Sequence, residues 1–194
     1  MTTVRGVVKK VELEKFQNVR RTGIIAINLA KGDSLKWAKL AVKGDEIILS
    51  TRSGRAIRFK ESDMRPMGRT AGGVKGITLK KDDEVSSFEV LGPKEEMNLL
   101  VVMSNGYAKQ TPLKEYKVQR RGGSGILTAK ITSKTGKLVS SHAIIDQTEL
   151  LAVSRRGQIL KTTIKSVREA GRATQGVRIM RLDKGDELVG TVCL

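Results

Sequence analysis

The chain is built from one motif that occurs four times. Each copy begins with a glycine followed by a basic, strand-like stretch, and these first glycines are Gly6, Gly54, Gly106 and Gly157. After a loop rich in arginine, each copy reaches a second glycine that opens an apolar run: Gly23, Gly73, Gly125 and Gly176. A period of about 50 residues indicates one supersecondary unit used four times, so the fold must be an array.

Within each repeat the local signals are those of short β-strands. Apolar runs at 46–50, 98–104 and 149–154 each end near a turn, and second strands follow at 55–60, 107–111 and 158–162. The glycine-opened run is a third strand, and a fourth follows at places such as 85–91 and 188–194. Four antiparallel strands per unit is the pattern of a propeller blade. We expect one all-β domain over 1–194, with repeats at about 1–44, 45–96, 97–147 and 148–194.

Two expectations concern equivalent positions in the repeats. Six residues past each second glycine stands an aliphatic residue that should be buried: Leu29, Leu79, Ile131 and Leu182. Residues 1–5 supply at most a stub of the strand that precedes the other first glycines. Either the last blade completes the first, or the strand lies upstream, as in a fragment of a longer protein.

The charge of the chain predicts a polyanionic partner. Lys and Arg total 37 against 20 Asp and Glu, a formal net charge of +17. Such a charge attracts polyanions, and its recurrence at matching repeat positions favours nucleic acid over a generic solvated surface. An anionic membrane surface is disfavoured because no amphipathic basic helix is visible.

Two sets of basic residues keep a fixed offset from the glycines. Four residues past the first glycine stand Lys10, Arg58, Gln110 and Lys161. Four residues before the second glycine stand Arg69, Arg121 and Arg172, with Arg20 and Arg21 nearby in the shorter first repeat. On a propeller, equivalent positions lie on a ring, and a ring of Lys and Arg can follow the phosphates of duplex DNA. Solvation of blade edges alone would not require the fixed offset.

The loop at 119–125 carries the sharpest signal for phosphate binding. Its glycines allow backbone N–H groups to approach a phosphate closely, and its adjacent arginines can bind phosphate oxygens bidentately. A Gly-Gly-x-Gly stretch is often a plain tight turn, but this one falls on the loop that is basic in the other repeats. The DNA-binding residues predicted here are Gln119, Arg120, Arg121, Gly122, Gly123 and Gly125.

This loop resembles the gyrase A box, and the repeats resemble the C-terminal domain of the A subunit of bacterial DNA gyrase. Asn105-Gly106-Tyr107 and the segments 73–77 and 171–177 carry the resemblance, which covers the whole chain. It implies a β-pinwheel, a propeller-like disc whose neighbouring blades exchange strands, with double-stranded DNA wrapped around a basic rim. It also implies a role in negative supercoiling. The partners would then be the B subunit of the enzyme together with the remainder of its A subunit. ATP and Mg²⁺ would be used in those other domains or subunits.

The chain departs from that family in two respects. Ser124 stands where the box usually carries Lys or Arg, and the box lies in the third of four repeats rather than in the first of about six blades. By motif order the repeats resemble the last four blades of a six-bladed disc. The A-type subunit of topoisomerase IV, which has related blades with eroded boxes, is therefore an alternative, and a protein-interaction propeller is a more distant one.

The sequence shows no pattern for catalysis or metal binding. The family's strand-cleaving tyrosine follows an arginine, whereas Tyr107 follows a glycine and Tyr116 a glutamate. His142 is the single histidine, with no partner for a metal site or a nucleophile. We expect a non-catalytic domain with no cofactor of its own.

Three further features bear on the cellular location of the protein and on the kind of nucleic acid that it binds. The single cysteine, Cys193, cannot form an internal disulfide, and no apolar run reaches the ~20 residues of a membrane span. These features predict a cytoplasmic protein without a membrane partner. The six aromatic residues fall mostly at strand positions and are expected in the core, which disfavours a binder of single strands.

Overall fold

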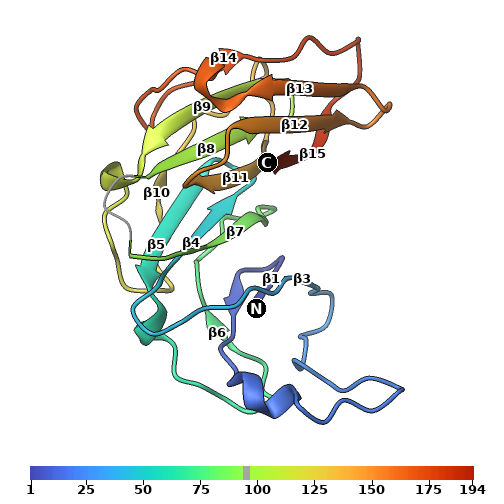
Figure 1. Cartoon of the computed structure of the whole chain (residues 1–194), viewed down its shortest axis with the longest axis vertical. Helices are drawn as coiled ribbons and strands as arrows, with labels where there is room; N and C mark the ends of the chain where they lie inside the picture. The colour runs from blue at the N-terminus through green and yellow to red at the C-terminus, as the bar shows by residue number, and fades with distance from the viewer. Residues whose placement is uncertain (94–96) are drawn as a thin grey trace.

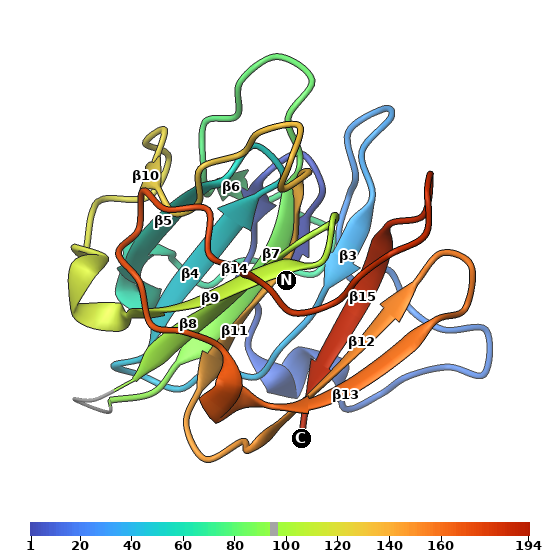
Figure 2. The same ribbon diagram turned by 90° about the horizontal axis from the view of Figure 1, so that it is seen from above.

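The computed structural model describes residues 1–93 and 97–194, and within them it is all β apart from four short 3-10 helices. Four antiparallel sheets follow one another along an arc, from the first repeat at the bottom of Figure 1 to the last at the top. Seen from above in Figure 2, the sheets fan out beside one another. None of the helices in this part of the chain is long and apolar enough to span a bilayer. The fold class expected from the sequence is confirmed.

The first three sheets share one strand order: the fourth strand of a repeat, then its first, then its second, then a short strand from the next repeat. The fourth sheet has the first three of these strands. The first sheet contains β3 (Leu35–Trp37), β1 (Thr2–Thr3), β2 (Val7–Val8) and β6 (Val74–Lys75). The second contains β7 (Val85–Leu91), β4 (Glu46–Thr51), β5 (Arg55–Lys60) and β10 (Ile126–Leu127). The third contains β11 (Leu138–Ile144), β8 (Asn98–Met103), β9 (Tyr107–Pro112) and β14 (Val177–Arg178). The fourth contains β15 (Leu188–Cys193), β12 (Glu149–Ser154) and β13 (Ile159–Thr163).

Neighbouring repeats are joined by strand exchange. β6 pairs with β2, β10 with β5 and β14 with β9, in each case across a repeat boundary. The second, third and fourth repeats therefore each donate their glycine-opened third strand to the preceding blade, which is the arrangement of a β-pinwheel. One 3-10 helix follows the second strand of each repeat: η1 (Leu13–Phe16), η2 (Glu61–Asp63), η3 (Leu113–Glu115) and η4 (Ile164–Ser166).

The recurring glycines are required where neighbouring repeats meet. Gly54 has a φ of +80°, and a Cβ there would lie 2.5 Å from the carbonyl oxygen of Ala129 in the next repeat. Its own carbonyl accepts hydrogen bonds from the N–H groups of Thr128 and Ala129, at 2.8 and 3.2 Å. Gly125, with a φ of +66°, would place a Cβ 2.5 Å from the carbonyl oxygen of Ala56. A side chain at either position would push the exchanged strand away, which explains why both glycines recur.

The hydrophobic core is divided among the gaps between successive blades. On β4, Ile47 and Leu49 pack toward the first blade, whereas Ile48 packs toward the third. On β8, Leu99 packs toward the second blade and Leu100 toward the fourth. Because both faces of these strands are covered, they read as unbroken apolar runs rather than as an alternating pattern.

The first repeat carries the shortened first strand that the sequence predicted. Thr2–Thr3 form β1, in the sheet position that β4, β8 and β12 occupy in the other repeats, but β1 has two residues where each of those strands has six. That the rest of this strand lies upstream stays a prediction. The glycine-opened run of this repeat, 23–29, pairs with none of the described strands.

The aliphatic residues six positions past the second glycine are less buried than expected. Leu79, Ile131 and Leu182 are half-buried at the margin of the core, and Leu29 is 40% exposed. Full burial falls two positions earlier, as at Ile77, because the first glycine of the preceding repeat holds that point of the exchanged segment against its blade. The expected repeat boundary at 96/97 adjoins residues 94–96, which lie outside the described residues.

Candidate nucleic-acid interface

In the first three repeats, the residue four positions past the first glycine contacts the 3-10 helix of the next repeat. Arg58 on β5 forms an ion pair with Glu46 at 2.5 Å and donates to the carbonyl oxygens of Leu113 and Tyr116, both at 3.1 Å. Gln110, at the same position of the next repeat, donates in the same way to two carbonyls around η4, at 2.9 and 2.8 Å. A neutral amide thus makes the same contact with the helix carbonyls as a guanidinium, so this contact does not require a charge.

The lysines at this position are also paired with carboxylates. Lys10 forms an ion pair with the largely buried Glu61, and Lys161 pairs with Glu149 at 2.9 Å. The side chain of Lys161 remains 59% exposed. DNA contact stays a prediction for Lys10, Arg58 and Lys161. Lys10 and Arg58 could make it only by leaving partners that are themselves mostly shielded from water.

The arginines four residues before the second glycine link successive loops. Their Nη1 atoms donate to backbone carbonyls at 3.0, 3.0 and 3.2 Å: Arg69 to Ile25, Arg121 to Lys75 and Arg172 to Leu127. Each acceptor lies two residues past the second glycine of the preceding repeat. A guanidinium has five N–H donors, so each arginine can hold the neighbouring loop and still offer donors to an external anion.

Arg20 and Arg21 are exposed in the loop of the first repeat, which closes through a bond from the N–H of Gly23 to the carbonyl of Arg20 at 2.8 Å. Neither guanidinium has an ion pair or side-chain hydrogen bond with any residue that the structure describes. Both predicted residues therefore stand on the surface with their charge unneutralised.

The loop at 119–125 is anchored to the preceding repeat through its carbonyl groups. Thr78 donates from Oγ1 to the carbonyl of Gly122 at 2.6 Å and from its backbone N–H to the carbonyl of Gly123 at 2.9 Å. The N–H of Gly122 donates to the carbonyl of Gly76 at 2.6 Å. These bonds fix the loop against the neighbouring blade.

Arg55 completes the anchoring of this loop. Its Nε donates to the carbonyl of Ser124 at 2.7 Å and its Nη2 to the carbonyl of Gly125 at 2.9 Å. This residue was not predicted from the sequence. No repeated offset marks it, since the equivalent positions hold Val7, Tyr107 and Gln158. Only the pairing of β5 with β10 brings it beneath the loop.

The opposite side of the same loop presents backbone donors. The carbonyls of residues 122–125 face the protein, and the N–H of a trans peptide points opposite to its carbonyl. The N–H groups of Gly123, Ser124 and Gly125 therefore face outward, and no acceptor for them lies among the described residues. Next to them, Arg120 is exposed and forms no ion pair within that part of the chain. Outward N–H groups beside a free guanidinium can bind an anion.

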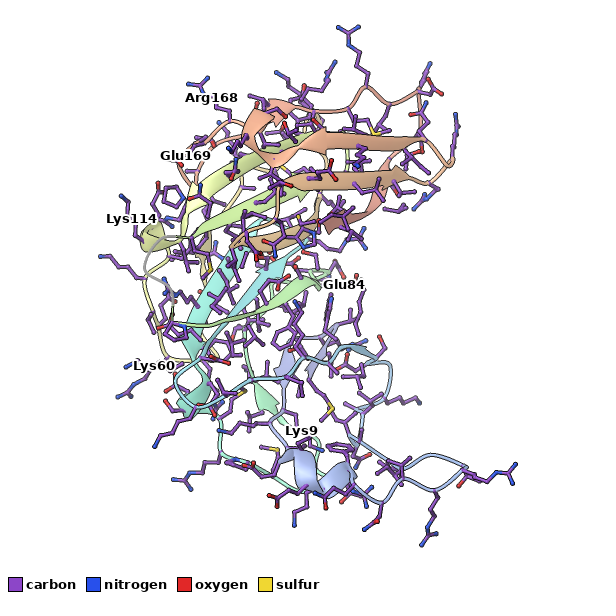
Figure 3. The ribbon with its side chains drawn as sticks, viewed as in Figure 1. Lys9, Lys60, Glu84, Lys114, Arg168 and Glu169 are labelled. Carbon is purple, nitrogen blue, oxygen red and sulfur yellow. The ribbon has the colours of Figure 1, made fainter. Side chains whose placement is uncertain are left out.

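Two lysines are buried beneath basic loops. Lys109 donates to the carbonyls of Gly171 and Arg172, both at 2.6 Å, and burial lowers its pKa to about 8. Lys9, at the same position of the first repeat, donates to three loop carbonyls, and burial lowers its pKa as well. Figure 3 shows Lys9 within the first blade. These two ammonium groups hold the loops in place through their carbonyls and are not available to an external ligand.

A third set of equivalent basic residues was not predicted from the sequence. Eleven residues past the first glycine stand Arg65, Lys117 and Arg168. All three are exposed, and none has a carboxylate partner among the residues described. They follow η2, η3 and η4, and Figure 3 shows Arg168 with Lys60 and Lys114 on the convex side of the arc. Their constant offset was the signal that could have found them.

The aromatic residues lie where the sequence predicted. Phe59, Phe88, Tyr107 and Tyr116 are at most 6% exposed, so their rings cannot stack on bases. Residues 1–93 and 97–194 contain no group of three or more His, Cys, Asp or Glu side chains that could hold a metal ion.

Blades that exchange strands along an arc define a β-pinwheel repeat domain. The chain belongs to the family described as DNA gyrase C-terminal domain, beta-propeller, which matches residues 1–41, 45–91, 98–144 and 148–194. The family expected from the sequence is confirmed.

Comparison with individual proteins gives the same family. The chain is 44% identical over 191 residues to the DNA gyrase A subunit of Mycolicibacterium smegmatis and 40% identical over 190 residues to that of Staphylococcus epidermidis. These matches cover 97% and 98% of the chain but only 22% and 21% of the relatives, so the chain spans about a fifth of their length. A solved DNA gyrase A C-terminal domain superposes with a TM-score of 0.86 at 31% identity, covering 99% of this chain and 64% of that one. A topoisomerase IV C-terminal domain shares the fold, with a TM-score of 0.92 at 23% identity over 100% of this chain and 60% of that one.

Proposed function

We propose that this domain binds duplex DNA without sequence preference and bends it around its convex side, in the service of negative supercoiling by a bacterial gyrase. The observation that carries the proposal is the row formed by Arg65, Lys117 and Arg168, each exposed and without a carboxylate partner among the residues that the structure describes. The loop at 119–125 provides further donors for phosphate, namely its outward-facing N–H groups and the guanidinium of Arg120. Periodic cations on a curved, rigid support match a polymer that carries a phosphate at regular intervals.

The rigidity of the support matters for bending. Bending a duplex of 20–30 bp by 40–90° costs on the order of 1–6 kcal/mol, which phosphate contacts must offset. Exchanged strands and the arginine bonds between loops hold the cations at fixed spacing, so ordering them on binding costs little. A loose chain of equal charge would bind DNA without imposing a curve.

The wider role rests on the relatives. Since the two relatives named above are gyrase A subunits, we favour gyrase over topoisomerase IV as the parent enzyme. The domain would then act in the cytoplasm with the remainder of the gyrase A subunit, and with the B subunit of the same enzyme. It would have no catalytic step or cofactor of its own, while ATP and Mg²⁺ serve other domains or subunits.

Binding and bending can be tested on one labelled duplex. Affinity for duplexes of unrelated sequence should be equal, and it should fall roughly a thousandfold between 50 and 200 mM salt if six or more phosphates are engaged. Energy transfer between dyes at the two ends should rise on binding. A shallow salt dependence, or strong preference for one duplex, would contradict a row of phosphate contacts.

Matched variants distinguish the effect of the proposed DNA-contacting cations Arg65, Lys117, Arg120 and Arg168, here called the rim, from the effect of net charge. Lys117→Ala and Arg120→Ala should each reduce the salt slope by about 1. Arg155→Ala removes the same charge from an arginine paired with Glu187 at 2.5 Å and should change the slope little. Replacing Arg120 and Arg121 together should reduce end-to-end energy transfer more than Arg69→Ala or Arg172→Ala, and Ser124→Lys should increase it. Equal effects of Lys117→Ala and Arg155→Ala would refute the assignment of the rim.

A further inference from the structure

The junction between the third and fourth repeats carries a basic hollow that belongs to neither of the predicted sets. It has a volume of about 590 Å³ and lies where β14 pairs with β9. The residues that line it include Tyr107, Lys134, Arg178 and Arg181. We propose that this hollow binds a backbone phosphate of the duplex, as an anchor additional to the rim, a proposal that rests on the DNA binding proposed above.

The cations of the hollow are arranged around one aromatic ring. Nζ of Lys134 lies 5.6 Å from the ring centroid of Tyr107, and Cζ of Arg178 lies 5.3 Å from it. Arg178 also donates from Nη2 to the hydroxyl oxygen of Tyr107 at 2.9 Å. The ring is 6% exposed, so it serves as a floor that orients the cations and not as a surface for a base.

The charges of the hollow are unneutralised. Lys134, Arg178 and Arg181 are exposed, and no carboxylate within the described residues forms an ion pair with any of them. Three like charges in one place repel one another, and a phosphate placed among them relieves that repulsion. Arg178 keeps donors beyond the one bound to Tyr107, so it can bind a phosphate oxygen in the same conformation.

The hollow is also pre-formed. The side-chain amide of Asn105 donates to the carbonyls of Ser133 and Lys134, at 2.9 and 3.2 Å, and thereby holds the turn that carries Lys134. Arg178 lies on the exchanged strand β14, whose position the first glycine of the third repeat fixes. Donors held in place before binding lose little entropy when a ligand arrives.

This constellation occurs at one junction of the chain. The positions equivalent to Tyr107 hold Val7, Arg55 and Gln158, and those equivalent to Arg178 hold Ile25, Lys75 and Leu127. At the preceding junction Arg55 takes the position of Tyr107 and binds loop carbonyls, and Leu127 takes the position of Arg178. The hollow lies one blade beyond the loop at 119–125, at the same level of the exchanged strands, so a duplex crossing that loop would next meet it.

The test uses a double variant, Lys134→Ala with Arg178→Ala, and Arg155→Ala as a control that removes a paired charge. The double variant should weaken duplex binding about tenfold at 100 mM salt and reduce the salt slope by about 1–2, beyond the control. Tyr107→Phe retains the ring and its packing but removes the acceptor of Arg178, and should weaken binding about twofold to fivefold. Circular dichroism and urea unfolding show whether each variant is folded.

Outcomes distinguish this proposal from the one on which it rests. If the unmodified protein does not bind duplex DNA, the proposed function fails. If it binds and the folded double variant matches Arg155→Ala in affinity and slope, the hollow is not an anchor. A second arm follows the Nε resonance of Arg178 by NMR during titration with inorganic phosphate alone and with the duplex. A shift with both supports the proposal, whereas a shift with inorganic phosphate only overturns the assignment to the DNA backbone.

Discussion

The contribution of strand exchange to the free energy of unfolding can be measured by making the same substitution at two equivalent glycines. Gly106 and Gly157 occupy the same repeat position, with φ values of +78° and +85°. A Cβ at Gly106 would lie 2.2 Å from the carbonyl oxygen of Met180, on the segment that the next repeat donates. A Cβ at Gly157 meets nothing within 4 Å. The two sites thus share a backbone conformation and differ in the contact with a following repeat.

The expected magnitudes follow from these contacts. Alanine in the left-handed region costs roughly 1–2 kcal/mol, so Gly157→Ala should lower the free energy of unfolding by about that much. Gly106→Ala carries the same cost and must also displace a backbone carbonyl. The carbonyl of Gly106 accepts bonds from the N–H groups of Ile179 and Met180 at 2.8 and 3.2 Å. Losing both adds roughly 1–3 kcal/mol, since a typical hydrogen bond contributes about 0.5–1.5 kcal/mol.

Urea unfolding followed by circular dichroism measures the difference between the two variants. Hydrogen exchange at the amides of Ile179 and Met180 gives a local readout, because only Gly106→Ala should expose them. If both variants lose the same free energy and the amides stay protected, the exchanged strand does not depend on close approach to the first glycine. A role of the repeated glycines in holding the exchanged strands would then be refuted.

Three further predictions concern single side chains. Arg58→Ala should lower the free energy of unfolding by about 2–3 kcal/mol through loss of charged hydrogen bonds, while Arg58→Gln should restore part of it in urea unfolding. Burial lowers the pKa of His142 from 6.5 to about 4, so the unfolded chain alone gains that proton, and stability should fall as pH drops from 6.5 to about 4. Burial raises the pKa of Glu89, which makes stability rise as pH drops and so opposes the effect of His142. The contribution of His142 is therefore obtained by comparing the pH dependence of stability with that of a His142→Gln variant. Burial raises the pKa of Cys193 to about 12, and iodoacetamide should modify it far more slowly at pH 8 than in urea; equal rates would contradict this.

The sequence by itself determined the repeat, the strands and the class of ligand to expect. The bounds expected for 149–154, 55–60 and 85–91 are those of β12, β5 and β7. They could be read because both-sided burial leaves unbroken apolar runs, and because turns at the repeated glycines mark their ends. The excess of Lys and Arg is likewise a property of composition and needs no coordinates.

Only the tertiary structure decided which cations are free to bind. Arg58 was predicted at the rim, but its partners are Glu46 on the adjoining strand and carbonyls about 55 residues further along the chain. Lys117 has no such partner among the described residues, although no local pattern in the sequence sets it above Arg58. The number of charges can be read from a sequence, but whether a charge is neutralised depends on what the tertiary fold places within 4 Å of it. The same reason applies to Arg55, which anchors the loop at 119–125 only because β10 crosses into the blade of β5.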